Sequence, residues 1–492
     1  MKKYTLNRAA GIVIKNSCLI LIAILPFEQS GCKKLVTVES PITSLTSTNV
    51  YNNDATAAAV LTGIYTSLSQ YNYQPGTSFN SISLASGLSA DELTLAGGSS
   101  NSNTLLAQFY LNALTAGNVT VPQGMWSVFY SNIYTVNVAI ERLAESNSLT
   151  PIVKQQLTGE AKFVRAFCYF YLTNLYGAVP LTTNSDFTVN ALLSRSAPTL
   201  VYQQIIADLK AAQSLLSNDY VASDAESSTT ERVRPNKWAA TALLARAYLY
   251  TGDWADAAAQ ATAIISNSSM YSLTPLNNVF LKNNNEAIWQ LQPVDAGWNT
   301  PDARVFILPL TGPTIFSTPS YPAYLSLSLL TSFEPGDQRR VNWVDSVTTS
   351  GATYYYPYKY KNATLNAAVT EYTMVLRLGE QYLIRAEVEA HGASGNAVVD
   401  LDIIRNRAGL PNYAGPMDPA SLLNAIYHER QVELFTEWGH RWLDLKRTGT
   451  VSSVMTTVAP LKKTTWNSGW QLYPLPSYDI KLDPNLVQNP GY

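Results

Sequence analysis

Carboxylates near the C-terminus are the side chains whose spacing most suggests chemistry. Glu429, Glu433 and Glu437 recur every four residues, and Arg441 and Asp444 follow them. On a helix, this spacing places the charges along one stripe. Two acids on opposite sides of a glycosidic bond would make a glycoside hydrolase. Acids on one helix cannot easily face each other across a substrate, and their apolar neighbours need burial. The pattern therefore favours a structural network of ion pairs and helix caps.

Other catalytic patterns are weaker. The three histidines are His391, His428 and His440, and none has a second histidine at the spacing of a helical zinc pair. The sequence leaves a Ser/His/Asp site open, but no Gly-x-Ser-x-Gly elbow supports one. Asp337 and Arg339 follow a Pro-Gly turn, and we interpret them as structural. We expect a protein without catalytic residues, metal or cofactor.

The amino-acid composition of the chain argues against some classes of binding partner. Charged residues make up only 14% of the 492 residues, against about 25% in typical domains. Neutral polar groups, including 30 tyrosines, must therefore cover much of the surface. The net charge is −2 and no basic block is present, which argues against a nucleic-acid partner. The three cysteines make no disulfide framework or zinc motif, and Cys168 lies in a hydrophobic run typical of a buried helix.

Residues 1–31 are typical of an export signal. Lysines and an arginine precede an apolar stretch over 17–27, which is shorter than the roughly 20 residues that span a bilayer. Ser30-Gly31-Cys32 then resembles a bacterial lipobox, from which Gln29 departs. We predict lipidation at Cys32 and a polar tether over 32–48; the alternative is ordinary signal cleavage. No later segment is long and apolar enough to cross a membrane.

Hydrophobic periodicity predicts a mostly α fold. Helices are expected over 54–70, 128–146, 152–175, 199–216, 375–392, 397–408 and 420–447. Residues 236–266 form two alanine-rich helices around Gly252, with Tyr248, Ala257 and Ala261 at tetratricopeptide offsets. Such pairs bury their faces only by stacking. We expect helical repeats over about 127–266 and 371–447, and an irregular, loop-rich insert over about 267–370 with a short strand at 287–291.

Four stretches of the chain resemble the SusD/RagB family. They are 159–170 with 175–181, 376–387 with 404–410, 429–434 with 437–447, and 472–476 with 488–492. Trp438 and His440 around Gly439 depart from the simpler Glu-Gly-x-Arg run of the family. The resemblance implies a tetratricopeptide-containing fold over 49–492 on the surface of a Gram-negative outer membrane. It also implies a partner, a SusC-like TonB-dependent transporter, and import of oligosaccharides or, in some branches, peptides.

A sugar site needs aromatic rings for the faces of the sugar and polar groups for its hydroxyl edges. The irregular segments offer both, and the family places its ligand site in corresponding loops. Our candidate ligand-binding residues are Tyr71, Tyr73, Asn101, Trp298, Tyr321 and Tyr324. The leading hypothesis is a nutrient-binding lipoprotein; a repeat scaffold for membrane protein assembly and, less favoured, a glycoside hydrolase are the alternatives.

Overall fold

The structure is a computed structural model that describes residues 47–70, 73–74, 78–79, 81–100, 104–115, 121–314 and 320–492. The predicted signal peptide and Cys32 lie outside the described residues. The chain divides into a short N-terminal unit and a main unit, Tyr51–Tyr492. Helix α1 (Ser47–Val50) is the described part of the first, and the paragraphs below concern the second.

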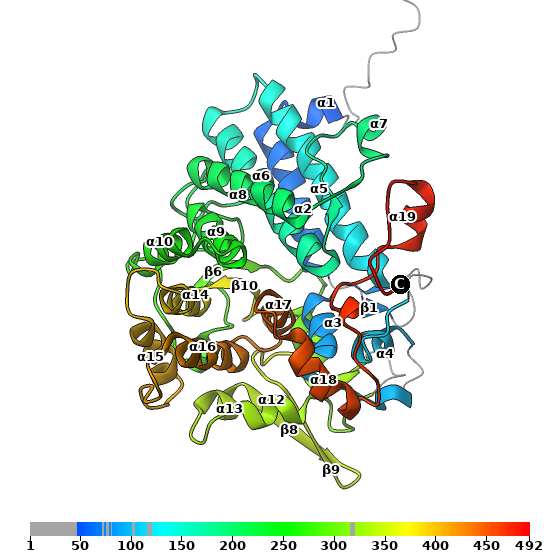
Figure 1. Cartoon of the computed structure of the whole chain (residues 1–492). Coiled ribbons are helices and arrows are strands. Elements are labelled where there is room, and N and C mark those ends of the chain that lie inside the picture. Colours follow the sequence, from blue (N-terminus) through cyan, green and yellow to red (C-terminus); the bar gives the residue numbers. More distant parts are fainter. Residues whose placement is uncertain are drawn as a thin grey trace, which may run out of the picture. The chain divides into compact units, whose positions relative to one another are not determined.

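The main unit is mostly helical, which confirms the predicted fold class (Figure 1). Four long helices, α2 (Asp54–Ser69), α5 (Val121–Glu145), α6 (Pro151–Tyr176) and α8 (Pro198–Leu215), pack side by side. Helix α6 is central, and Phe163, Phe167, Cys168 and Phe170 on it are fully buried. Among the described residues, no helix combines the length and the hydrophobicity that crossing a membrane requires.

The alanine-rich pair continues this stack. Helices α9 (Lys237–Thr251) and α10 (Trp254–Ile265) turn at Gly252, whose φ of 81° is easy for glycine and costly for other residues. Ala257 and Ala261 are fully buried, which allows close helix approach. Helix α10 packs against α14 (Leu378–Ala390), and α15 (Ala397–Arg407) and α16 (Pro419–Glu433) follow. The predicted helix-pair scaffold is therefore present. Its two parts are separated in the sequence by the insert, and they contact each other where α10 packs against α14.

Buried ion pairs join neighbouring helices of the stack. Arg165 on α6 donates two hydrogen bonds of 2.7 Å to Asp208 on α8. Arg246 on α9 donates to both carboxylate oxygens of Glu380 on α14, at 2.6 and 2.7 Å. Burial raises the pKa of Glu380, but the surrounding cations, Arg246 foremost, together lower it to about 2. Because both members are desolvated, each pair constrains which helices can meet.

Two predicted helices are wrong in part. The segment expected to start a helix at 375 begins as strand β10 (Thr373–Arg377), which pairs antiparallel with β6 (Ala287–Leu291). Both strands are buried on both faces, and apolar periodicity cannot distinguish such a strand from a buried helix. The helix expected over 420–447 is interrupted: α16 ends at Glu433, α17 (His440–Arg447) follows, and six residues lie between them. Helix α5 also starts earlier than predicted.

The break between α16 and α17 is a backbone requirement. Thr436, Trp438 and Gly439 all have positive φ. At Gly439 a Cβ atom would lie 2.7 Å from the hydroxyl of Ser86, so glycine is needed for close approach as well as for its φ of 75°. The turn directs the side chain of Glu437 inward instead of along a helical stripe.

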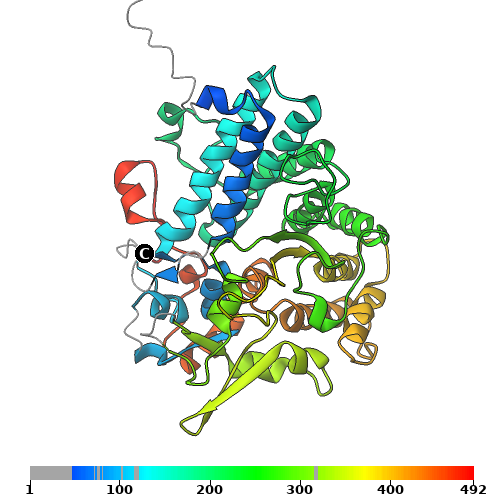
Figure 2. The same cartoon turned by 180° about the vertical axis from the view of Figure 1, so that it is seen from behind.

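The segment between α10 and α14 carries short helices and a hairpin. These are α11 (Pro301–Phe306), α12 (Leu327–Ser332), α13 (Gln338–Asn342), β7 (Ala323–Leu325), and β8 (Val344–Thr349) paired antiparallel with β9 (Ala352–Pro357). The hairpin projects at the lower edge in Figure 2 and was not predicted. Strand β7 pairs with β3 (Leu93–Leu95), which joins this segment to the N-terminal part of the main unit.

Shorter elements complete the described chain. They are α3 (Ile82–Ser89), α4 (Thr104–Tyr110), α7 (Phe187–Asn190), α18 (Val451–Leu461), α19 (Ser477–Leu482), the 3-10 turns Gly98–Ser100, Leu276–Asn278 and Ser468–Gln471, and the strand pairs β1 (Tyr73–Gln74) with β2 (Ser78–Phe79) and β4 (Val179–Pro180) with β5 (Arg195–Ser196). The repeat and insert boundaries proposed from the sequence stay a prediction.

Overpacking the helix pair should test the scaffold. Ala257→Trp is expected to destabilise the protein by about 1–3 kcal/mol or more, because the buried alanine leaves no room for an indole. Ala259→Trp is the matched control, since Ala259 lies two residues away on the exposed side of α10. Thermal unfolding followed by circular dichroism measures both. Equal melting temperatures for the two variants would contradict close packing at Ala257.

Candidate functional site

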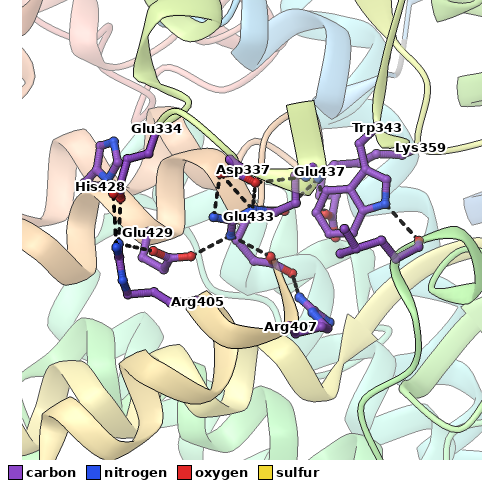
Figure 3. Close-up of polar contacts among 12 residues, drawn as sticks. Glu334, Asp337, Trp343, Lys359, Arg405, Arg407, His428, Glu429, Glu433 and Glu437 are labelled. Atoms are coloured by element: carbon purple, nitrogen blue, oxygen red, sulfur yellow. Dashed lines mark hydrogen bonds and ion pairs between the residues drawn. The ribbon is translucent and has the colours of Figure 1, made fainter. Parts of the chain in front are cut away.

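The C-terminal acids are buried and surrounded by cations. Glu429 and Glu433 lie on the last turns of α16 and are fully buried, and Glu437 in the following turn is 6% exposed. Glu433 accepts hydrogen bonds from Arg339 at 3.0 Å and Arg377 at 2.6 Å, and also pairs with Arg407 (Figure 3). The predicted ion-pair network is therefore present.

The network extends from Glu433 in both directions. Glu437 accepts from the Lys359 ammonium at 2.5 Å and from Arg377 at 2.8 Å. Glu429 accepts from Arg339 at 2.6 Å, and Arg339 also pairs with Asp337 at 2.9 Å. The geometry of Asp337 and Arg339, both buried, agrees with the structural interpretation of their turn.

The other two members of the expected stripe pair elsewhere. Arg441 donates two hydrogen bonds of 2.8 Å to Asp91, which follows α3. Asp444 accepts from Arg430 at 2.8 Å and from Arg447 at 2.7 Å. The single charged stripe was therefore wrong in its geometry, because a turn interrupts the helix after Glu433.

The electrostatic surroundings of the network keep Glu433 in its charged form. Burial raises the pKa of Glu433, but Arg407, Arg377 and Arg339 together hold it well below the usual value. Burial lowers the pKa of Lys359 to about 8, against the opposing effect of Glu437. A general acid in glycoside hydrolysis needs a raised pKa and a path to substrate. Glu433 has a lowered pKa and is covered by guanidinium groups, so its geometry suits a structural charge.

The histidines lie in three different environments. His391 stacks on Trp254 with ring centroids 4.3 Å apart, and burial lowers the pKa of His440 to about 4. His428 lies near Glu334 and Glu429, a trio close enough to share a metal ion. Arg405, however, donates to Glu334 at 2.6 Å and contacts Glu429 (Figure 3). A guanidinium already neutralises both acids, so a metal ion would have to displace it.

The structure brings three predicted ligand residues together. Trp298 precedes α11, Tyr321 precedes β7 and Tyr324 lies on β7; all three are half-buried. Tyr71 and Asn101 lie outside the described residues. Tyr73 is in strand β1, and its side chain is likewise not described. The candidate site is therefore built on Trp298, Tyr321 and Tyr324.

Arg304 on α11 lies against the ring of Trp298. Helix α11 begins at Pro301 and is capped by the hydroxyl of Thr300, which orients its first turns. Its Arg304 guanidinium carbon lies 4.7 Å from the ring centroid of Trp298, and the same group pairs with Asp295. Helix α11 packs against strand β7, which brings Arg304 to the part of the chain that holds the two tyrosines. Burial raises the pKa of Tyr321, and the positive charge of Arg304 opposes the rise.

The tyrosines rest on a small hydrophobic cluster under the hairpin. Leu308, Val347 and Tyr356 are its buried members, and Tyr321, Tyr324 and Tyr354 pack on it. The rings of Tyr324 and Tyr354 meet edge to face at 5.1 Å. We call Trp298, Arg304, Tyr321, Tyr324 and Tyr354 the aromatic patch.

Sequence reasoning missed two members of the aromatic patch. Tyr354 lies in a Thr-Tyr-Tyr-Tyr run whose alternation on a strand could have revealed it. No local sequence pattern marks Arg304 as a site residue. Only its contact with Trp298 in the structure assigns it to the aromatic patch. Half-buried rings beside a guanidinium offer flat apolar faces with a hydrogen-bond donor at their edge. Such a surface suits ligands that have both apolar faces and hydroxyl or carbonyl edges.

Comparison with known proteins indicates the family to which the chain is similar. Two family profiles match it, one described as starch-binding associating with outer membrane over residues 39–249, the other as the SusD family over 342–492. SusD-like protein P2 of Formosa agariphila is 27% identical over 514 residues, which cover 94% of this chain and 97% of the relative. Together the two profiles and this relative span most of the chain.

Solved structures share the fold. A laminarin-binding SusD-like protein is 25% identical with a TM-score of 0.71, over 89% of this chain and 100% of that one. Surface glycan-binding protein A from Bacteroides thetaiotaomicron, solved with laminarihexaose, is 20% identical with a TM-score of 0.74, over 89% and 99%. The fold is that of a tetratricopeptide-like helical protein with a loop-rich region between its helix pairs. The chain belongs to the SusD/RagB family.

Removing the central acid should unfold the network. Glu433→Ala leaves three guanidinium groups without their shared counter-charge and is expected to cost about 3–5 kcal/mol in the free energy of unfolding. Glu145→Ala is the control, because its ion pair with Arg142 is exposed and worth less than about 1 kcal/mol. Guanidinium chloride denaturation of both variants tests this. A Glu433 variant as stable as the Glu145 variant would show that the network is dispensable.

Proposed function

We propose that this protein is a cell-surface lipoprotein that captures a glycan and delivers it to a partner SusC-like TonB-dependent outer-membrane transporter. The observation that carries the proposal is the aromatic patch, in which Arg304 of α11 lies over Trp298 and α11 packs on β7, the strand next to Tyr321. Sugar rings stack on aromatic faces, and the guanidinium supplies donors for hydroxyl groups at the ring edge.

The comparisons support a glycan over other ligands. The family profile over residues 39–249 is described as starch-binding, and one solved relative is described as binding laminarin. Both are neutral glucans. A peptide is the alternative ligand, and binding assays with peptides and with glycans separate the two.

Binding without chemistry is expected. Stacking on a few rings and a few hydrogen bonds, reduced by the entropy lost on ordering, gives a Kd in roughly the micromolar to millimolar range. A protein that hands its ligand to a transporter also has to release it, and each 1.4 kcal/mol of added affinity slows release about tenfold at a fixed association rate. The ion-paired acids described above argue against the hydrolase alternative.

Trp298 is the residue to test first. Trp298→Ala should weaken binding of a glycan found in a panel that includes laminarihexaose and maltohexaose, because a stacking face is lost. Trp254→Ala is the control, since Trp254 is also half-buried and stacked, but on His391 of the repeat scaffold. Isothermal titration calorimetry measures both. Equal affinity of the two variants would place the ligand elsewhere, and absence of binding to every glycan would refute the proposed function.

The membrane anchor is a separate part of the proposal. It rests on Ser30-Gly31-Cys32 behind the apolar stretch of the leader. Cys32→Ala should leave the protein without lipid, and the variant should no longer fractionate with the outer membrane. Metabolic labelling with a palmitate analogue and membrane fractionation measure the two effects. A Cys32→Ala protein that still takes up label would refute the lipobox.

A further inference from the structure

A recessed pocket with a cavity volume of about 70 Å³ shares helix α11 with the aromatic patch. It is formed where α2 ends, where α3 and α11 begin, at the first residue of β10, and by the apolar side chains of Met125, Val128 and Phe129 on α5. Helix α11 contributes to both the pocket and the aromatic patch. Asp302 in its first turn lines the pocket, and Arg304 lies over the ring of Trp298. The lining is rich in hydroxyl groups, and the members used below are Ser83, Asp302, Thr373 and Trp438.

Two polar groups of the pocket lack partners. The side-chain hydroxyl of Thr373 is buried and has no hydrogen-bond partner among the described residues, although Thr373 is only 8% exposed. A buried hydroxyl without a partner costs about 1–3 kcal/mol. Asp302 has no hydrogen bond or ion pair within the described part of the chain. Burial, and then the charge of Glu437, raise the pKa of Asp302 to about 7.

Trp438 supplies an aromatic wall that is held rigidly. Its φ of 46° is rarely adopted by bulky residues, and such strain persists only where surrounding contacts fix it. Here the backbone N–H of Trp438 donates to the Ser83 hydroxyl at 3.1 Å and the indole N–H to the Met374 carbonyl at 2.8 Å. The ring also packs on Phe167 at 5.5 Å. The indole is thus fixed before any ligand arrives.

We propose that this pocket receives one terminal residue of a neutral glycan, with a sugar face on Trp438 and hydroxyl groups hydrogen-bonded to Thr373 and Asp302. The inference rests on the proposed function and adds to it the chemical class and the mode of recognition. An aromatic wall with unpartnered hydroxyl and carboxyl groups matches a pyranose ring. An acidic sugar is disfavoured because the carboxyl group of Asp302 lines the pocket, and Asp302 and Glu437 line one small neighbouring cavity.

The test uses the purified mature protein and calorimetry with laminarihexaose and maltohexaose. Thr373→Val keeps the side-chain shape and removes the hydroxyl, and it should weaken binding of the hexasaccharide about five- to tenfold. Asp302→Leu should weaken it at least as much, while Asp302→Asn, which still forms hydrogen bonds, should lose less. Thr331→Val is the control, since Thr331 lies on α12, outside the pocket lining. Melting temperatures verify that each variant is folded.

The outcomes separate this inference from the proposed function. If Trp298→Ala weakens binding but Thr373→Val and Asp302→Leu bind as the wild type does, the aromatic patch binds the glycan and the pocket inference is overturned. If no glycan binds the wild type, the proposed function itself fails. Tighter binding of an oligogalacturonate than of either glucan would overturn the neutral class. Should Asp302→Leu unfold, Thr373→Val and Asp302→Asn decide the question.

Discussion

Charges buried in a protein have to be neutralised where they lie, and the centre of this structure depends on that requirement. Arg377 ends strand β10 and donates to Glu286 before β6, to Glu433 at the end of α16 and to Glu437 in the next turn. One guanidinium therefore joins a two-stranded sheet to a helix end. Moving one of these elements away would separate buried charges from their partners, which is costly, so the network favours this one arrangement of the elements.

The loop-rich region is positioned by the same network. Lys359, which follows the β8–β9 hairpin, reaches Glu437, and Arg339 on α13 reaches Glu429. These contacts fix both sides of the hairpin relative to α16. The hydrophobic cluster beneath Tyr354 then sets where Tyr321 and Tyr324 lie. The aromatic patch is thus carried by short elements whose own hydrogen bonds would not hold them, and the buried charges supply the missing constraint.

The motifs that revealed the family are largely residues of this framework. Arg165, Arg377 and Glu433 all lie in the stretches that resemble SusD/RagB proteins, and all are buried in ion pairs. The rings of the aromatic patch lie outside those stretches. Such a division explains why the sequence identifies the fold readily and the ligand poorly. Packing and charge neutralisation restrict the framework residues, whereas loops that face a ligand are free to differ.

The sequence by itself determined the helices, the alanine-rich turn at Gly252 and the family, because these follow from local periodicity and from motifs read along the chain. It also indicated Trp298, Tyr321 and Tyr324 as candidates, but not that they meet. Tertiary structure decided that 373–377 is a strand, that the helix is interrupted after Glu433, and that Arg304 lies over Trp298. Those outcomes depend on contacts between distant segments, such as the pairing of β3 with β7, and no local pattern encodes them.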